Sequence, residues 1–491
     1  MLNPDKLLAS RPSLDALRAE YQVVEDVLAG PAALKNLQPG RQGRAECPYL
    51  PRNRNEHPDE YATRLALTPV FSETSAVLQA RLGALFRKAP TLTLPPALST
   101  LETQATLRGA ALADVAAQVA QLVQRQGFCG VLLDRAPLPE DAKGRTVSRD
   151  EARRRGLGRV VLAPCAASQI LDWGEDAQGL AWVKLLENFD DAPAWDSAPE
   201  RRAVVRVADR EALRVYEIRE SASGPSVRAF PAVPHGARDA HGRPCVPFVF
   251  FHPFPGRDGL GRSVLRPVAE ADLAATRILS ELMWMLHMMT PLLALTTSRE
   301  EQDLGEIGLG ASRFLVLRAA RHAEPAENLS FVQLDPTAAD RLAQMYERMI
   351  AKAREQALRT GAAVAGPVEQ SGISKAWSFK TGEERLLFLL GRELQTGFQK
   401  ILDLAERMSG LPAGRAAIVF PDAYDVDSPD APVALAERVL PIFERYGLTS
   451  ASASILERLY ENLAVNPSGV RWTEFQNQLA RVRTRKSKVS M

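Results

Sequence analysis

The feature that most constrains the fold is a long amphipathic helical pattern over residues 337–358. Apolar side chains recur there at intervals of three and four residues, which is the spacing of one face of an α-helix. Thr337 with Asp340 resembles a capping box, with Asp in place of the usual Glu. The pattern predicts an apolar stripe and, about 100° or more away, a basic one. The apolar stripe holds Leu342, Met345, Tyr346, Met349 and Ile350, and the basic stripe holds Arg341, Arg348, Lys352 and, just beyond, Arg359.

A second helix is predicted over residues 263–289, apolar on more than one face, so we expect it to be packed on several sides. Between the two helices, residues 291–334 combine glycines with short apolar runs, which predicts a small β-containing insertion. After residue 360 comes a Gly- and Ser-containing linker. Thr381 and Glu384 then form a capping-box pattern that opens a helix running to about Met408.

The first half of the chain predicts an α+β arrangement. Helical spacing covers residues 3–30, 59–88 and about 112–126. The period then changes, and short β-like runs follow at intervals typical of antiparallel meanders. These runs are residues 131–133, 160–162, 182–186, 203–207, 213–218 and 248–251.

The composition is that of an ordinary globular protein. Of the 491 residues, 46% are hydrophobic and 24% charged, and 61 basic against 59 acidic residues leave a net charge of +2. These values exclude a disordered or basic nucleic-acid-coating chain, so any polyanion must be bound locally. The four cysteines are isolated, which predicts neither a disulfide framework nor a zinc ribbon and favours a reducing compartment. The start of the sequence shows no secretory signal pattern, so we expect the protein to stay where it is made.

Catalytic motifs are missing from the sequence. It contains no HExxH, GxSxG or Walker pattern, and Gly259-Leu-Gly261 lacks the third glycine of a dinucleotide loop. We therefore expect no catalytic residue, no metal and no cofactor. Two alternatives stay open: a metal-dependent nucleic-acid enzyme, and an integral membrane or membrane-docking protein that uses residues 282–295 of the uncharged stretch 282–298. The enzyme would use the carboxylates of Asp422, Asp425, Asp427 and Asp430.

A series of motifs, in order and spacing, resembles the tailed-phage portal proteins of a family long catalogued as a domain of unknown function. The resemblance covers roughly residues 45–425, while residues 190–243 and the C-terminal region depart from it. The motifs are Glu60-Tyr61-x-x-Arg64-Leu65, Thr68-Pro69-Val70-Phe71, Gly83-x-Leu85-Phe86-Arg87-Lys88-Ala89-Pro90, Gly127-x-x-Gly130-Val131-Leu132-Leu133-Asp134, Ile170-Leu-Asp-Trp173, Pro247-Phe248-Val249 and Ser371-Gly-Ile-Ser-Lys375.

The resemblance implies a portal-like division of the chain. Residues 1–262 would form N-terminal helices and an α/β wing, 263–290 the first stem helix, 291–335 the clip and 336–360 the second stem helix. Residues 361–379 would hold the tunnel loop, 380–430 a wing helix and strand, and 431–491 a helical crown with a basic tail.

The resemblance also implies a function. Portal proteins form rings, usually dodecamers, at one capsid vertex of the virion, where they pass double-stranded DNA and dock terminase, a head-tail adaptor, and capsid and scaffolding proteins. On this interpretation the protein is assembled in the host cytoplasm and is not an enzyme. The DNA-channel candidates are Arg341, Arg348, Lys352, Arg359 and Lys375. A solvated helix face is the other interpretation of the basic stripe, and it stays open here.

Overall fold

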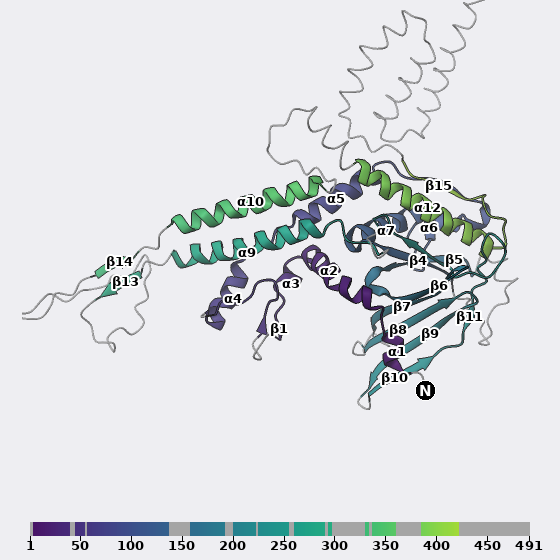
Figure 1. The fold of residues 1–491 in the computed structure, drawn as a ribbon, viewed down its shortest axis with the longest axis horizontal. Helices are drawn as coiled ribbons and strands as arrows, with labels where there is room; N and C mark the ends of the chain where they lie inside the picture. Colours follow the sequence, from purple (N-terminus) through teal and green to yellow (C-terminus); the bar gives the residue numbers. More distant parts are fainter. Residues whose placement is uncertain are drawn as a thin grey trace, which may run out of the picture. The chain divides into compact units, whose positions relative to one another are not determined.

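The computed structural model describes residues 3–39, 45–54, 56–136, 158–191, 200–221, 224–254, 260–289, 293–296, 329–332, 336–359 and 384–421. These residues belong to one compact unit of the chain. They form a mixed α and β structure, as the sequence predicts (Figure 1). The second unit, residues 370–380 and 425–491, lies outside the described residues.

The N-terminal part is helical, but two of its predicted helices are interrupted. The helix expected over residues 3–30 is divided into α1 (Pro4–Leu8) and α2 (Pro12–Ala29). The helix is interrupted because the Arg11 N–H, at the break, donates to the Leu171 carbonyl and not to a carbonyl of α1. The helix expected over residues 59–88 is α4 (Pro58–Leu67) and α5 (Glu73–Leu85), separated at Pro69, which disfavours helix at its predecessor. Short elements complete this part: α3 (Pro31–Leu34), β1 (Gln38–Pro39), β2 (Ala45–Glu46), β3 (Thr91–Thr93), a 3-10 turn η2 (Pro96–Leu98) and α6 (Thr100–Gln104).

The largest sheet is an antiparallel meander in the order β10-β9-β8-β7-β6, with β11 paired to β9 (Figure 1). Three of the predicted runs form its central strands β7, β8 and β9, whereas the sequence does not predict β6 and β10. Apolar clusters lie on both faces of the sheet: Leu213 of β9 belongs to the main core, and Ile218 of the same strand packs in a cluster with Leu7 of α1. The strands are β6 (Ile170–Asp176), β7 (Gly179–Asp191), β8 (Glu200–Asp209), β9 (Ala212–Ser221), β10 (Gly224–Ala229) and β11 (Val233–Pro234).

A second, three-stranded sheet runs in the order β12-β4-β5. Helix α7 (Leu112–Gln126) packs on β4 and β5, and α12 (Glu384–Met408) packs on β12. The main hydrophobic core lies between the two sheets and α2, and includes Phe128, Leu132, Trp173 and Phe248. The strands are β4 (Cys129–Arg135), β5 (Val160–Ala166), which runs into the 3-10 turn η3 (Ala167–Gln169), and β12 (Phe248–Phe251).

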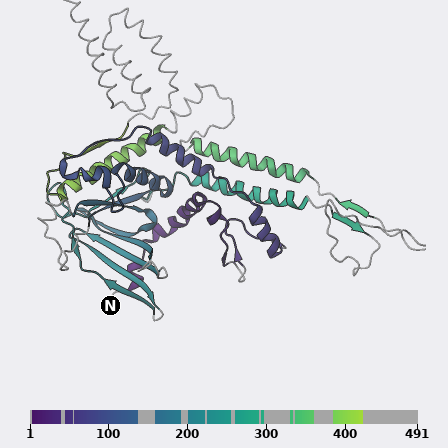
Figure 2. The same ribbon diagram turned by 180° about the vertical axis from the view of Figure 1, so that it is seen from behind.

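Two long helices, α9 (Arg266–Met289) and α10 (Thr337–Arg359), lie side by side in both ribbon views (Figures 1 and 2). In the chain they are separated by β13 (Leu293–Thr296) and β14 (Leu329–Val332), which pair antiparallel. The C-terminal half of α9 packs against the N-terminal half of α10, so the helices are antiparallel. Strand β15 (Ala417–Val419) pairs with β3 and ends the described chain.

None of the described helices is long and apolar enough to cross a membrane. The uncharged stretch 282–298 divides between the end of α9 and β13, as a helix followed by a strand. In the described residues the stretch therefore contributes to helix packing, because Leu282 is buried against α10.

Acid pH is expected to destabilise the large sheet through His235. The ring is buried, its Nε2–H donates to the Asp209 carbonyl at 2.8 Å, and the Ala237 N–H donates to Nδ1 at 3.0 Å, so the neutral ring is required. Burial lowers the pKa of His235 below its ordinary value, while Asp134 opposes this more weakly. Below about pH 6.5 His235 is therefore protonated in the unfolded chain but not in the folded chain. The free energy of unfolding falls by up to about 1.4 kcal/mol per pH unit until the pH reaches the pKa of His235 in the folded chain.

Urea unfolding of the unassembled subunit between pH 5 and 8 checks this expectation. We expect His235→Gln to flatten the dependence of the unfolding free energy on pH in this window. The matched control is His57→Gln, since the side chain of His57 is 68% exposed. An unchanged pH slope in His235→Gln would contradict the assignment.

Candidate nucleic-acid interface

The basic stripe of α10 faces away from α9. At 3.6 residues per turn, Arg341, Arg348 and Lys352 lie within about 20° of one line along the helix. All three are exposed, and none forms an ion pair with a described residue. The buried side of α10 is turned by roughly 150° from this line. It carries Ala339, Leu342, Ala343, Tyr346, Ala353 and Ala357.

Two of the predicted DNA-channel residues have no described side chain. Arg359 is the last residue of α10, and 18 residues from Arg341 it falls on the same line. Lys375 lies outside the described residues, as do the predicted tunnel loop and the Asp422–Asp430 segment. The structure therefore brings Arg341, Arg348 and Lys352 together on one helix face, and extends that line to the backbone of Arg359.

The predicted apolar stripe of α10 is wrong at one position. Met345 is 45% exposed and lies about 40° from the basic line, while Leu342 and Tyr346 pack against α9. The reason is that α9 packs on the side of α10 that carries Ala339, Ala343 and Tyr346, and Met345 lies outside that side. The exposed face of α10 is therefore basic with one methionine in it.

Arg354 is a cation of α10 whose role differs from that of the basic stripe, although the sequence does not distinguish them. It lies on the side of α10 that meets α5, where its Nη2 is 2.8 Å from Oε1 of Glu73. Glu73 raises the pKa of Arg354, and burial opposes this. Arg354 is thus a structural cation, whereas the three stripe residues are available to a ligand.

The helix pair is attached to the rest of the unit by a buried carboxylate, Asp272 of α9. Its Oδ2 accepts hydrogen bonds from the Thr74 N–H at 2.8 Å and the Thr74 hydroxyl at 2.7 Å, at the first turn of α5. Burial raises the pKa of Asp272 despite these hydrogen bonds. This cap could not be predicted from the sequence, because the two residues are 198 positions apart.

A buried guanidinium, Arg64 of α4, forms the second attachment. Its Nε and Nη2 donate to both oxygens of Glu56 at 2.7 and 2.9 Å, and its Nη1 donates to Ser280 of α9 at 3.1 Å. Burial alone would raise the pKa of Glu56, but the hydrogen bonds from Arg64 and the Asn53 N–H hold it below its ordinary value. Arg64 lies in a motif of the portal resemblance, which is the only sequence signal for it.

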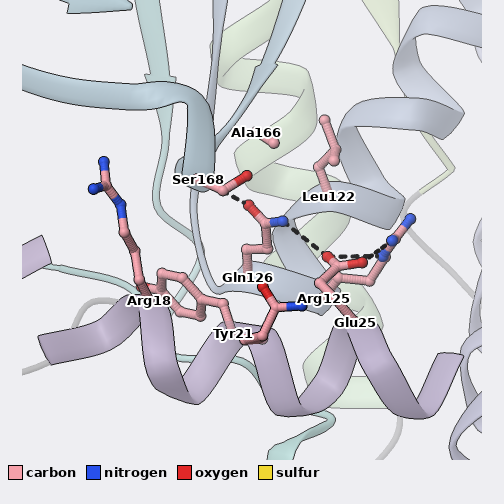
Figure 3. A pocket seen from close by; sticks show the side chains of 9 residues that line it. Arg18, Tyr21, Glu25, Leu122, Arg125, Gln126, Ala166 and Ser168 are labelled. Atoms are coloured by element: carbon pink, nitrogen blue, oxygen red, sulfur yellow. Dashed lines mark hydrogen bonds and ion pairs between the residues drawn. The ribbon is translucent and has the colours of Figure 1, made fainter. Parts of the chain in front are cut away.

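A small open pocket between α2, α7 and η3 offers no comparable site (Figure 3). Glu25 accepts hydrogen bonds from Arg125 and from Gln126 Nε2, and the Ser168 N–H donates to Gln126 Oε1. Arg18, at the other end of the pocket, pairs with Asp15 at 3.0 Å. The guanidinium groups of Arg125 and Arg18 are each paired with a carboxylate of this chain. These contacts connect elements of the fold and leave neither arginine for a ligand.

The described residues contain no group of three or more His, Cys, Asp or Glu side chains that could hold a metal ion. Gly261, part of the Gly259-Leu-Gly261 pattern, packs its backbone against Gly127, and a Cβ on it would lie 2.0 Å from the Gly127 carbonyl oxygen. The close packing of the Gly261 backbone on the Gly127 backbone thus explains why a residue without a Cβ stands at position 261. The stripe on α10 is the best candidate for a functional site within the described residues.

The sequence matches no protein-family model and no curated protein. Among solved structures it is similar to a chain in the virion of a native gene transfer agent particle, at 13% identity and a TM-score of 0.36, over 77% of this chain and 89% of that one. It is also similar to a chain in the neck of the native particle, a structure computed with C12 symmetry, at 13% identity and a TM-score of 0.37 (80% and 90% covered). Within the described ranges the chain is an α+β protein with an antiparallel helix pair, and Arg341, Arg348 and Lys352 on its exposed face form no ion pair with a described residue.

Proposed function

We propose that the chain is a portal protein of a tailed phage or phage-like particle. It would form a ring at one capsid vertex of the virion, pass double-stranded DNA during packaging and ejection, and dock terminase and a head-tail adaptor. The observation that carries the proposal is the α9–α10 pair. It is antiparallel, has two β-strands between its helices in the chain, is attached through Asp272 and Arg64, and has a cationic line on its outer face.

The element order supports the proposal together with the sequence resemblance. An α/β region is followed by α9, a strand pair, α10 and, after residues outside the described set, α12. In the proposed portal these are wing, first stem helix, clip, second stem helix and wing helix. Along α10, the stripe from Arg341 to Arg359 spans about 27 Å at 1.5 Å per residue, so a ring of copies would present tiers of positive charge.

Phosphate contacts of this kind are independent of DNA sequence, and a limited number of them lets DNA slide. Asp340 and Glu347, exposed about 100° from the stripe, keep the helix from being cationic all round. We also propose that the protein is not an enzyme and that a separate motor supplies packaging energy. ATP hydrolysis or DNA cleavage by the pure ring would contradict this.

Purified protein should form closed rings with a central hole in negative-stain electron microscopy. Identical subunits in a closed ring meet head to tail, so each subunit offers two different surfaces. Mass photometry gives the copy number, for which we expect twelve. A compact monomer or a two-fold dimer at high concentration would overturn the proposal, and so would a species that needs detergent to stay in solution.

The triple substitution Arg341→Gln, Arg348→Gln and Lys352→Gln should leave ring assembly intact and weaken DNA binding. Each lost phosphate contact lowers the slope of log K against log salt by about one. The measurements are the salt dependence of duplex binding by the ring and the nuclease-protected DNA per particle. The matched control, Asp340→Asn with Glu347→Gln, removes exposed charge from the flank of the same helix and should not weaken binding. If the triple variant failed to assemble, the stripe would belong to a subunit interface.

A further inference from the structure

A second cluster of arginines lies on the large sheet. Glu217 of β9 is 4% exposed, and its Oε1 accepts hydrogen bonds from Arg202 of β8 at 3.2 Å and from Arg219 of β9 at 3.1 Å. Arg228 of β10 is the register partner of Glu217. Arg202 and Arg219 thus contact the Glu217 carboxylate, and Arg228 lies beside it on the next strand.

This arrangement is unfavourable for the sheet alone. Arg202 and Arg219 are directly opposite each other in the β8–β9 register, and like charges in that position destabilise a strand pair. Arg228 is a diagonal neighbour of Arg219, at a spacing of about 7 to 8 Å. The arginines hold the pKa of Glu217 below its ordinary value against the effect of burial, so its one negative charge is fully present. Arg202 and Arg219 both stabilise the Glu217 carboxylate, whereas Arg228, the register partner of Glu217, is a further cation on this face.

Arg219 and Arg228 are also accessible. The side chain of Arg219 is 49% exposed, and Arg228 is exposed and lies over the ring of Phe230, 5.0 Å from its centroid. Val227, which points to the other side of β10, packs with Leu7 of α1. The covered face of β10 is therefore the opposite one, and β10 is the last strand of its sheet among the described elements.

We infer that this face of β9 and β10 is a docking surface for an acidic peptide segment of a partner protein. Guanidinium groups bind carboxylates through paired N–H donors, and Phe230, 40% exposed, offers an apolar contact beside them. Duplex DNA fits less well, because it presents a phosphate charge about every 1.7 Å along its axis. Arg219 and Arg228, beside the buried Glu217, match a peptide with two or three carboxylates better than they match the dense charge of a duplex. The inference does not rest on the proposed portal function.

The test uses the full chain and a fluorescent ten-residue peptide of alternating Glu and Thr, which places its carboxylates on one side when extended. Anisotropy titrations should show binding by the wild type and at least about tenfold weaker binding by Arg219→Gln with Arg228→Gln. The control is Arg214→Gln, which lies on the opposite face of β9 and pairs with Asp209, and it should bind like the wild type.

Equal peptide binding by the double variant and the wild type would overturn the inference. So would a double variant that loses binding to a 20-base-pair duplex more than to the peptide, because the surface would then serve phosphates. Circular dichroism of both variants checks that the sheet is intact. Ring formation and DNA retention should be unchanged in the double variant, which separates this inference from the portal proposal.

Discussion

Arg64→Leu is expected to lower the free energy of unfolding of the unassembled subunit by about 3 to 5 kcal/mol. The substitution leaves the Glu56 carboxylate, whose side chain is 4% exposed, without the guanidinium that neutralises it. Removing one partner of a buried ion pair costs this much because the remaining charge stays out of water. The hydrogen bond from Arg64 to Ser280 of α9 is lost at the same time, while the one from Thr68 at the end of α4 remains. The measurement is urea unfolding followed by circular dichroism.

The double variant Arg64→Leu with Glu56→Leu should recover a large part of that loss, because no buried charge remains. The surface control is Arg243→Gln. Arg243 pairs with Asp239 at 2.7 Å and its side chain is 52% exposed, and exposed pairs contribute about 1 kcal/mol or less. A loss below about 1 kcal/mol in Arg64→Leu would show that α4 is not held to α9 through this side chain.

Gly261→Ala should destabilise the subunit by about 3 kcal/mol or more, or prevent it from accumulating as soluble protein. An alanine Cβ at this position would lie 2.0 Å from the Gly127 carbonyl oxygen and 2.4 Å from its carbonyl carbon. Both are backbone atoms, so relief requires moving the junction of α7 and β4 away from the segment that leads into α9. The hydrogen bond from the Tyr21 hydroxyl to the Gly261 carbonyl, 2.8 Å long, would be strained as well.

Gly83→Ala is the matched control for this steric argument. Gly83 lies within α5, and a Cβ there meets no atom within 4 Å. Alanine in an open helix interior is more favourable than glycine by about 0.5 to 1 kcal/mol, so we expect Gly83→Ala to stabilise the subunit slightly. Thermal unfolding of both variants gives the comparison. Equal midpoints for Gly261→Ala and the wild type would contradict the close crossing.

The two variants also differ in what they predict for assembly. Gly261 is five residues before the start of α9, so a displaced crossing would shift the direction in which the helix pair leaves the sheets. If the ring of the proposed portal depends on that direction, any Gly261→Ala protein that folds should assemble poorly. Gly83→Ala should form rings like the wild type.

Most of the long elements and the basic stripe of α10 could be predicted from the sequence. Helical and strand spacing predicted α7, α9, α10, α12 and the central strands β7, β8 and β9, because the period of apolar residues is a local property of each segment, but it missed β6 and β10. The same spacing placed Arg341, Arg348 and Lys352 on one side of α10, since residues seven and four apart share a helix face.

Which side chains of α10 are exposed depends on tertiary contacts. Met345 is exposed and Arg354 is paired with Glu73, because the directions from which α9 and α5 approach α10 are set by contacts between residues 198 and 281 positions apart. The breaks in the two N-terminal helices, the buried Arg64–Glu56 pair and the arginines around Glu217 have the same origin. Each depends on groups that meet only after folding, and local periodicity carries no information about such partners.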